Sequence, residues 1–75
     1  MWQEIDHKLC KTFTFQDFSS AIAWMNKAAA IAEQMDHHPE WTNIYNIIHV
    51  KLYTHTSGDI ITEKDYLLAK QMDAL

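Results

Sequence analysis

Histidine and carboxylate side chains gather in residues 33–41 of this 75-residue chain. Helical spacing would place Glu33 and His37 four residues apart on one helix face. His37 is expected in the last turn of that helix, where the negative end of the helix dipole favours a protonated imidazole by roughly 0.3–1 kcal/mol. Glu33 and Asp36 act in the same direction because nearby carboxylates favour the charged ring. A histidine that holds a proton near neutral pH can donate it to a leaving group.

Two further histidines complete the candidate set. The extended backbone that Pro39 imposes on His38 is expected to turn that side chain away from His37. His55, at the end of a predicted strand, can approach from across the sheet edge. Three histidines that titrate near neutrality supply both an acid and a base. Histidines near a helix end are also common as structural or exposed residues, so the residues alone leave both interpretations open.

Other kinds of chemistry are weaker candidates. Glu33, His37 and His55 would form a two-histidine, one-carboxylate metal set. The chain has no His-Glu-x-x-His sequence, and adjacent histidines rarely chelate one ion together, so we expect no metal. Cys10, the single cysteine, is expected to be a packing residue in a strand and not a nucleophile. Gly58 alone cannot form a phosphate-binding loop.

Composition limits the partners and the compartment. The chain has six lysines, no arginine and ten acidic residues, for a net charge of −4. Without the arginine fork that contacts phosphate and guanine, nucleic-acid binding or a highly anionic substrate is disfavoured. An apolar content of 48% with nine aromatic residues excludes disorder, and no apolar run reaches the roughly 18 residues of a membrane span. We expect one domain over residues 1–75, in the cytoplasm, because the lone cysteine and the absence of signal-peptide features favour that compartment.

Hydrophobic periodicity predicts the elements that position the histidines. Alternation predicts four strands, over residues 2–5, 9–15, 41–45 and 48–55. Helical spacing predicts two helices, over residues 17–37 and from residue 62 onward. Asp17 is the expected N-cap of the first helix, which Pro39 ends. A tight turn is expected at Asn46, which tolerates left-handed backbone angles, and Thr62 with Asp65 has the spacing of a capping box.

The apolar residues of the helices define their buried faces. One row of the first helix consists of Phe18, Ile22, Met25, Ala29 and Ala32, and a second row of Ala21, Trp24, Ala28, Ile31 and Met35. In the last helix the expected buried residues are Leu68, Met72 and Leu75. The order ββαββα predicts an α+β fold, with a two-layer, four-stranded antiparallel sheet and two helices on one face. The other sheet face, expected to carry aromatic residues, predicts association into a homodimer or homotetramer.

A longer pattern runs from residue 33 to residue 65: an acid, three residues, His-His-Pro, an aromatic residue, a histidine and an aspartate. The matching positions are Glu33, His37-His38-Pro39, Tyr45, His55 and Asp65. Upstream, Trp2, Leu9, Phe13-Thr14-Phe15 and Asp17-Phe18 extend the match over nearly the whole chain. The sequence resembles the pterin-4a-carbinolamine dehydratase family. Many members carry an additional N-terminal helix before the tryptophan, and this chain is expected to lack it.

The resemblance implies elimination of water from a 4a-hydroxy-tetrahydropterin to give quinonoid dihydropterin, without metal or organic cofactor, in tetrahydrobiopterin recycling beside an aromatic amino-acid hydroxylase. His37 and His38 would act as acids toward the hydroxyl, and His55 would assist proton transfer at the ring. Residues that would orient the histidines or the substrate are Glu33, Asp36, Pro39, Trp41 and Asp65. The uncharged pterin agrees with a chain that lacks arginine.

The resemblance also leaves a second class of function open. Vertebrate members of the family serve as dimerisation cofactors for a homeodomain transcription factor. A non-catalytic protein-binding module on the same fold is therefore the alternative to an enzyme. A role in molybdopterin metabolism is a third possibility that rests on family distribution alone.

Overall fold

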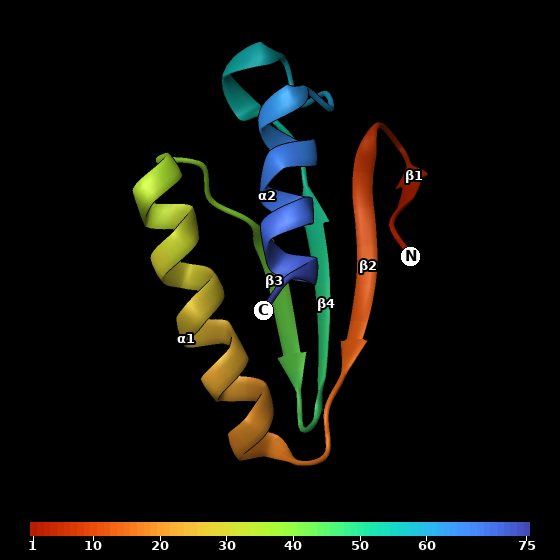
Figure 1. Ribbon diagram of the computed structural model, residues 1–75. Helices are drawn as coiled ribbons and strands as arrows, with labels where there is room; N and C mark the ends of the chain where they lie inside the picture. The colour runs from red at the N-terminus through yellow and green to blue at the C-terminus, as the bar shows by residue number, and fades with distance from the viewer.

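The computed structural model describes residues 1–75 and has the expected α+β architecture (Figure 1). The elements in chain order are β1 (Gln3–Ile5), β2 (Lys8–Thr14), α1 (Phe18–Met35), β3 (Glu40–Ile44), β4 (Ile47–Leu52), the 3₁₀ turn η1 (His55–Ser57) and α2 (Glu63–Asp73). The four strands form one antiparallel sheet in the order β1-β2-β4-β3. The central strands β2 and β4 therefore come from different halves of the chain. No helix is both long enough and apolar enough to span a membrane.

One face of the sheet is covered by the helices. Along β4, Ile48, Val50 and Leu52 are buried, whereas His49 and Lys51 between them are exposed. This alternation with a period of two is typical of a strand with one buried face and one solvent-exposed face. Each fully buried side chain of this size contributes about 1.5–3 kcal/mol through the hydrophobic effect.

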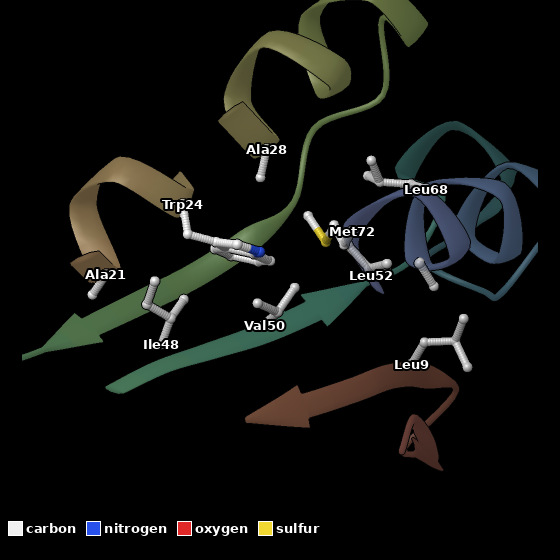
Figure 2. Close-up of a cluster of buried hydrophobic side chains, with 10 residues drawn as sticks. Leu9, Ala21, Trp24, Ala28, Ile48, Val50, Leu52, Leu68 and Met72 are labelled. Carbon is white, nitrogen blue, oxygen red and sulfur yellow. The ribbon is translucent and has the colours of Figure 1, made fainter. Parts of the chain in front are cut away.

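The core lies between the helices and β4. Figure 2 shows Trp24 and Ala28 of α1 and Met72 of α2 directed toward Val50 and Ile48 of the sheet. Small alanines on α1 let that helix approach the sheet closely, and the indole ring occupies the remaining space. The two helices and the sheet thus share one continuous core.

The buried face of α1 differs in part from the expected one. Its buried residues are Ala21, Trp24, Ala28 and Ala32, which come mainly from the second row. Phe18 and Ala29 of the first row are exposed. The prediction that both rows are buried was wrong at these positions because the helix contacts the sheet along a single narrow stripe. Leu75 is also exposed, because α2 ends at Asp73 and the terminal residue lies beyond the stripe.

The uncovered sheet face carries no aromatic residue of the strands, contrary to expectation. Cross-strand partners share a face, and on this face His49 lies opposite Thr12 on β2 and Thr42 on β3. The aromatic residues within the strands lie on the core side instead. The rings of Phe13 and Trp41 have centroids 4.4 and 6.4 Å from that of Trp24. Phe13 and Trp41 alternate in step with the buried residues of their sheet and therefore face the core, so the apolar residues on the open face of the strands are isoleucines, among them Ile5 and Ile44, which are exposed.

The turn between β3 and β4 also differs in detail. Tyr45, and not Asn46, has the left-handed backbone angle, with φ of 52°. The side chain of Asn46 instead donates a hydrogen bond to the carbonyl oxygen of Phe15 at 2.8 Å, and the amide of Phe15 donates to the carbonyl of Asn46 at 2.8 Å. Asn46 therefore joins the turn to the end of β2, which a local turn preference cannot reveal.

The start of α1 confirms the predicted cap. The Oδ1 atom of Asp17 accepts a hydrogen bond from the amide of Ser20 at 2.8 Å. The other end differs, because α1 ends at Met35, two residues earlier than expected. Asp36 adopts a left-handed conformation with φ of 50°, and the amide of His37 donates to the carbonyl of Ala32 at 3.0 Å. This is a Schellman-type end, which satisfies free carbonyls of the last turn before Pro39 has any effect.

Replacing Asp17 with alanine is expected to lower the melting temperature at neutral pH. The hydrogen bonds from Ser20 hold the pKa of the Asp17 carboxyl below its ordinary value of 3.8. Because the pKa of Asp17 is lower in the folded than in the unfolded protein, the ionised carboxylate stabilises the fold at pH values above the ordinary pKa. This stabilisation is lost as the pH falls through the lower, folded-state pKa. Thermal melts of wild type and Asp17→Ala should therefore converge as the pH falls through the lowered folded-state pKa. Asp17→Asn, which keeps a capping oxygen without the charge, is the control. A difference in melting temperature between wild type and Asp17→Ala that persists in strong acid would contradict the explanation.

Candidate active site

Three segments distant in the sequence meet at one end of the sheet. They are the chain after α1, the chain after β4 and the first turn of α2, all at the upper end of the molecule in Figure 1. Together they form an open cleft of about 320 Å³. The residues that line the cleft are Asp36, His37, His38, Tyr53, Thr54, His55, Thr56 and Lys64. This volume is at the lower end of the roughly 300–1,000 Å³ typical of small-molecule sites.

His37 is the buried histidine of the cleft, with 8% of its surface exposed. Its position follows from the end of α1, because the Schellman-type turn directs the chain back toward the sheet. The Nε2 atom lies 2.5 Å from Oδ1 of Asp65, a residue 28 positions further along the chain. The expectation that His37 lies in the last helical turn was wrong, since the helix ends before it. Asp65, and not the helix end, is therefore its electrostatic partner.

Asp65 is fully buried, with none of its surface exposed. It belongs to the first turn of α2, where its Oδ2 atom accepts a hydrogen bond from the amide of Thr62 at 2.8 Å. This is the reciprocal bond of the capping box that the spacing predicts. The same carboxylate contacts His37, so one side chain both starts the helix and holds a histidine of the cleft.

Glu33 pairs with His38 and not with His37, which corrects the prediction from helical spacing. Its Oε1 atom lies 2.7 Å from Nε2 of His38, and both side chains are exposed. The spacing argument failed because His37 has left the helix, so the four-residue rule no longer describes its direction. The prediction that His38 turns away from His37 agrees with their different partners, since His37 contacts Asp65 of α2 and His38 contacts Glu33 of α1, although both histidines line the same cleft.

His55 reaches the cleft from a short turn and not from a strand. β4 ends at Leu52, and His55 begins the 3₁₀ turn that Gly58 closes with φ of 85°. Its Nδ1 atom lies 2.8 Å from Oδ1 of Asp59. The His55 side chain is 88% exposed. The predicted strand ran too far because Tyr53 and Thr54 continue the alternation after the ladder with β2 and β3 has ended.

The remaining residues of the sequence-based set divide between two places. Asp36 lines the cleft beside His37. Pro39, Trp41 and Glu33 line a neighbouring groove of about 560 Å³ between α1 and the edge strand β3, which shares His38 with the cleft. Tyr45, the aromatic residue assigned from the family pattern, lies at the β3–β4 turn, at the opposite end of the sheet (Figure 1). The match of Tyr45 to the pattern therefore does not place it near the histidines.

Four residues of the cleft were missed by the sequence analysis: Tyr53, Thr54, Thr56 and Lys64. Adjacency was the available signal, because three of them flank His55 and the fourth precedes Asp65. Lys64 is the one lysine among the cleft residues. The Tyr53 hydroxyl donates a hydrogen bond to Oε1 of Glu40 at 2.8 Å, and the ammonium of Lys8 lies 4.5 Å from its ring centroid.

Tyr53 gives a measurable check of this wall of the cleft. The hydrogen bond to Glu40, followed by burial and nearby carboxylates, raises the pKa of Tyr53 above its ordinary value of 10.0. Glu40→Ala is expected to lower the pKa toward that value, as measured by phenolate absorbance. Tyr53→Phe removes this titration and identifies it among the three tyrosines. Because the raised pKa favours the neutral phenol in the folded state, the associated stability should be lost as the pH rises through the raised value. An unchanged titration in Glu40→Ala would refute the contact.

The donors considered for a metal are separated into pairs. Glu33 contacts His38, His37 contacts Asp65, and His55 contacts Asp59. No group of three or more histidine, cysteine or carboxylate side chains has a geometry that could hold a metal ion. Each cleft histidine has instead one carboxylate on one ring nitrogen, which leaves the other nitrogen for a ligand. This arrangement is suited to proton transfer.

The fold and the cleft define a class of protein: a small α+β protein whose imidazoles, held by carboxylates, gather at one end of an antiparallel sheet. The chain belongs to the pterin 4 alpha carbinolamine dehydratase family, whose sequence pattern matches residues 1–75. A dehydratase is a lyase, and the family resemblance deduced from the sequence is thereby confirmed.

Relatives and solved structures agree with this membership. A protein of Prochlorococcus marinus is 49% identical over 74 residues, which are 99% of this chain and 76% of that protein. A protein of a Jannaschia species is 43% identical over 76 residues, with the same shares. Both carry the provisional name pterin-4-alpha-carbinolamine dehydratase. The crystal structure of a transcriptional coactivator/pterin dehydratase from Brucella melitensis has a TM-score of 0.93 and 44% identity, covering 97% of this chain and 79% of that one.

A second solved structure shares the fold alone. It is a pterin dehydratase-like protein described as a RuBisCO assembly factor of the alpha-carboxysome. It has a TM-score of 0.78 and 24% identity, and the match covers 99% of this chain and 84% of that one. The fold is therefore found in proteins with different described roles, so function must be argued from the site.

Proposed function

We propose that this protein eliminates water from a 4a-hydroxy-tetrahydropterin and releases quinonoid dihydropterin. The observation that carries the proposal is the convergence of His37, His38 and His55, from two distant segments, on one cleft. Family membership supplies the substrate class. The cleft has polar walls and a single lysine, which suits an uncharged bicyclic ring with several hydrogen-bonding atoms.

The elimination needs two proton transfers. The C4a–O bond breaks as a protonated imidazole gives its proton to the departing hydroxyl, which leaves as water. The N5–H proton passes to a neutral imidazole, and its electron pair forms the C4a=N5 double bond. In our proposal His37 and His38 serve the hydroxyl and His55 serves the ring. Each positioned acid or base contributes typically about 10²–10⁴-fold.

The other residues have supporting roles in this proposal. Asp65 orients His37, Glu33 orients His38, and Asp36 lines the cleft beside them. Pro39 and Trp41 form the adjoining groove, where part of the substrate would extend past His38. No metal or organic cofactor takes part.

The proposed setting is tetrahydrobiopterin recycling in the cytoplasm. The substrate would be supplied by an aromatic amino-acid hydroxylase, since such enzymes leave a 4a-hydroxy-tetrahydropterin. We further propose that the single domain over residues 1–75 works as a homodimer or homotetramer. The support is the small size of the core, which favours stabilisation by a second copy. Sedimentation at micromolar concentration would distinguish the two assemblies.

The deciding experiment is stopped-flow absorbance of 4a-hydroxypterin decay with and without the protein. A decay rate that rises in proportion to protein concentration is expected. A rate equal to the spontaneous one, with folded protein at micromolar concentration, would reject the proposal.

The second candidate is a protein-binding module without turnover. The observation that favours it is the double description of the Brucella melitensis relative as transcriptional coactivator/pterin dehydratase. The same stopped-flow experiment separates the two, because a binding module leaves the spontaneous rate unchanged.

A further inference from the structure

The carboxylate of Asp65 receives three hydrogen-bond contacts from three parts of the chain. His37 Nε2 lies 2.5 Å from Oδ1, the hydroxyl of Thr54 donates to Oδ2 at 2.9 Å, and the amide of Thr62 donates to Oδ2 at 2.8 Å. Asp65 is fully buried and Thr54 is 4% exposed. Only His37 of these partners belongs to the acid–base machinery proposed above.

The two threonine hydroxyls form a chain that ends on this carboxylate. Oγ1 of Thr62 lies 2.5 Å from Oγ1 of Thr54. An ionised carboxylate only accepts hydrogen bonds, so Thr54 must donate to Asp65 and has its lone pairs free for the Thr62 hydroxyl. Every buried side-chain nitrogen and oxygen in the structure has a partner, so the chain of hydroxyls is complete.

This arrangement restricts how Asp65 meets His37. The two donors on Oδ2 fix the rotation of the carboxylate, and Oδ1 is then the atom that faces the imidazole. Because that atom accepts, Nε2 of His37 must carry a proton, and in the neutral ring Nδ1 carries the lone pair. An imidazole held in one tautomer has one defined nitrogen available for proton transfer, as the role requires.

We propose that Thr54 is a positioning residue that fixes the tautomer of His37 through Asp65. The inference rests on the proposed dehydratase function for its effect on rate, but its structural part stands independently. Loss of the Thr54 hydroxyl leaves Oδ2 with one donor in place of two. The carboxylate then rotates, and His37 samples both tautomers.

Nuclear magnetic resonance of ¹⁵N-labelled histidine tests the structural part without any substrate. In wild-type protein, at a pH at which the ring is neutral, His37 is expected to show protonated Nε2 and unprotonated Nδ1. Thr54→Val keeps the shape and removes the hydroxyl, and it should give averaged shifts from both tautomers. Thr54→Ser keeps the hydroxyl and should restore the wild-type pattern. A wild-type His37 protonated at Nδ1, or a single unchanged tautomer in folded Thr54→Val, would overturn the proposal.

Steady-state kinetics of dehydration are the second test of the proposal. Thr54→Val is expected to lower kcat for dehydration by about tenfold with little change in KM, which is the usual scale for an outer partner of a site residue. Thr54→Ser should stay close to wild type. A Thr54→Val variant with altered tautomers but unchanged kcat would reject the link to catalysis and keep the structural part. Absence of turnover in wild type would reject the proposed function, and the resonance experiment would still decide the role of Thr54.

Discussion

Replacing His55 with alanine is expected to lower kcat for 4a-hydroxypterin dehydration by more than about tenfold and to leave the fold intact. The side chain is exposed, and Asp59, which it contacts, is exposed as well. An exposed pair of this kind contributes about 0–1 kcal/mol to stability, so the melting temperature should hardly change. The loss of rate would therefore report the chemistry of the ring and not unfolding.

His37→Ala is expected to lower the rate by at least the same factor, with a loss of stability because its carboxylate partner is buried. His37→Gln is expected to be more stable than His37→Ala, because the glutamine amide can donate a hydrogen bond to Asp65. It should still lose activity, because an amide cannot accept or release a proton as imidazole does. His49→Ala is the matched control, because His49 is an exposed histidine on the open sheet face, where its Nδ1 contacts Thr12. Steady-state rates and thermal melts should be measured for all four variants. If folded His37→Ala and His55→Ala both retained wild-type rates, the assignment of the histidines would be wrong.

Replacing Asp65 with alanine should cause a large loss of stability. The substitution leaves the amide of Thr62 and the hydroxyl of Thr54 without their acceptor. Asp65 is fully buried, so water does not readily replace its carboxylate. Each buried polar group left unpaired costs about 1–3 kcal/mol, and the unpaired Thr62 amide is also the lost capping bond, which alone is worth about 0.5–2 kcal/mol. A small protein with total stability near 5 kcal/mol is then close to unfolding at room temperature.

Urea denaturation of Asp65→Ala, Asp65→Asn and wild type tests this expectation. Asparagine keeps one acceptor but places an amide NH₂ against a donor, so its loss of stability should be smaller than that of alanine and still clear. Glu63→Gln, an exposed acid in the same helical turn, is the control and should lose little. An Asp65→Ala midpoint equal to that of Glu63→Gln would show that the network contributes nothing to folding.

Local patterns were enough to predict most of the fold. The alternation in β2 and β4, the helical spacing after Phe18, and the caps at Asp17 and Thr62 each depend on residues within a few positions of one another. These are short-range preferences, which act in any chain with the same local sequence. The errors in the element bounds are that α1 stops two residues early and β4 stops before His55. The predictions of which side chains face the core failed at Phe18 and Ala29 of α1 and for the aromatic residues of the strands.

The candidate histidines were also identified from the sequence, but their partners were not. Glu33 was assigned to His37 by spacing, whereas it contacts His38. The residue that does contact His37 lies 28 positions away on another helix. Spacing rules describe contacts within one regular helix. Asp36, which has a left-handed backbone conformation, ends that helix before His37.

The amino-acid sequence by itself therefore determined the order of elements, the residues of the caps and the identity of the imidazoles. Only the tertiary structure decided that the end of α1, the turn after β4 and the start of α2 meet, and that Asp65 joins two of these segments. The reason is physical: secondary structure follows from the chemistry of near neighbours, whereas the cleft exists because burial of Trp24, Val50 and Leu68 in one core brings distant segments to the same end of the sheet.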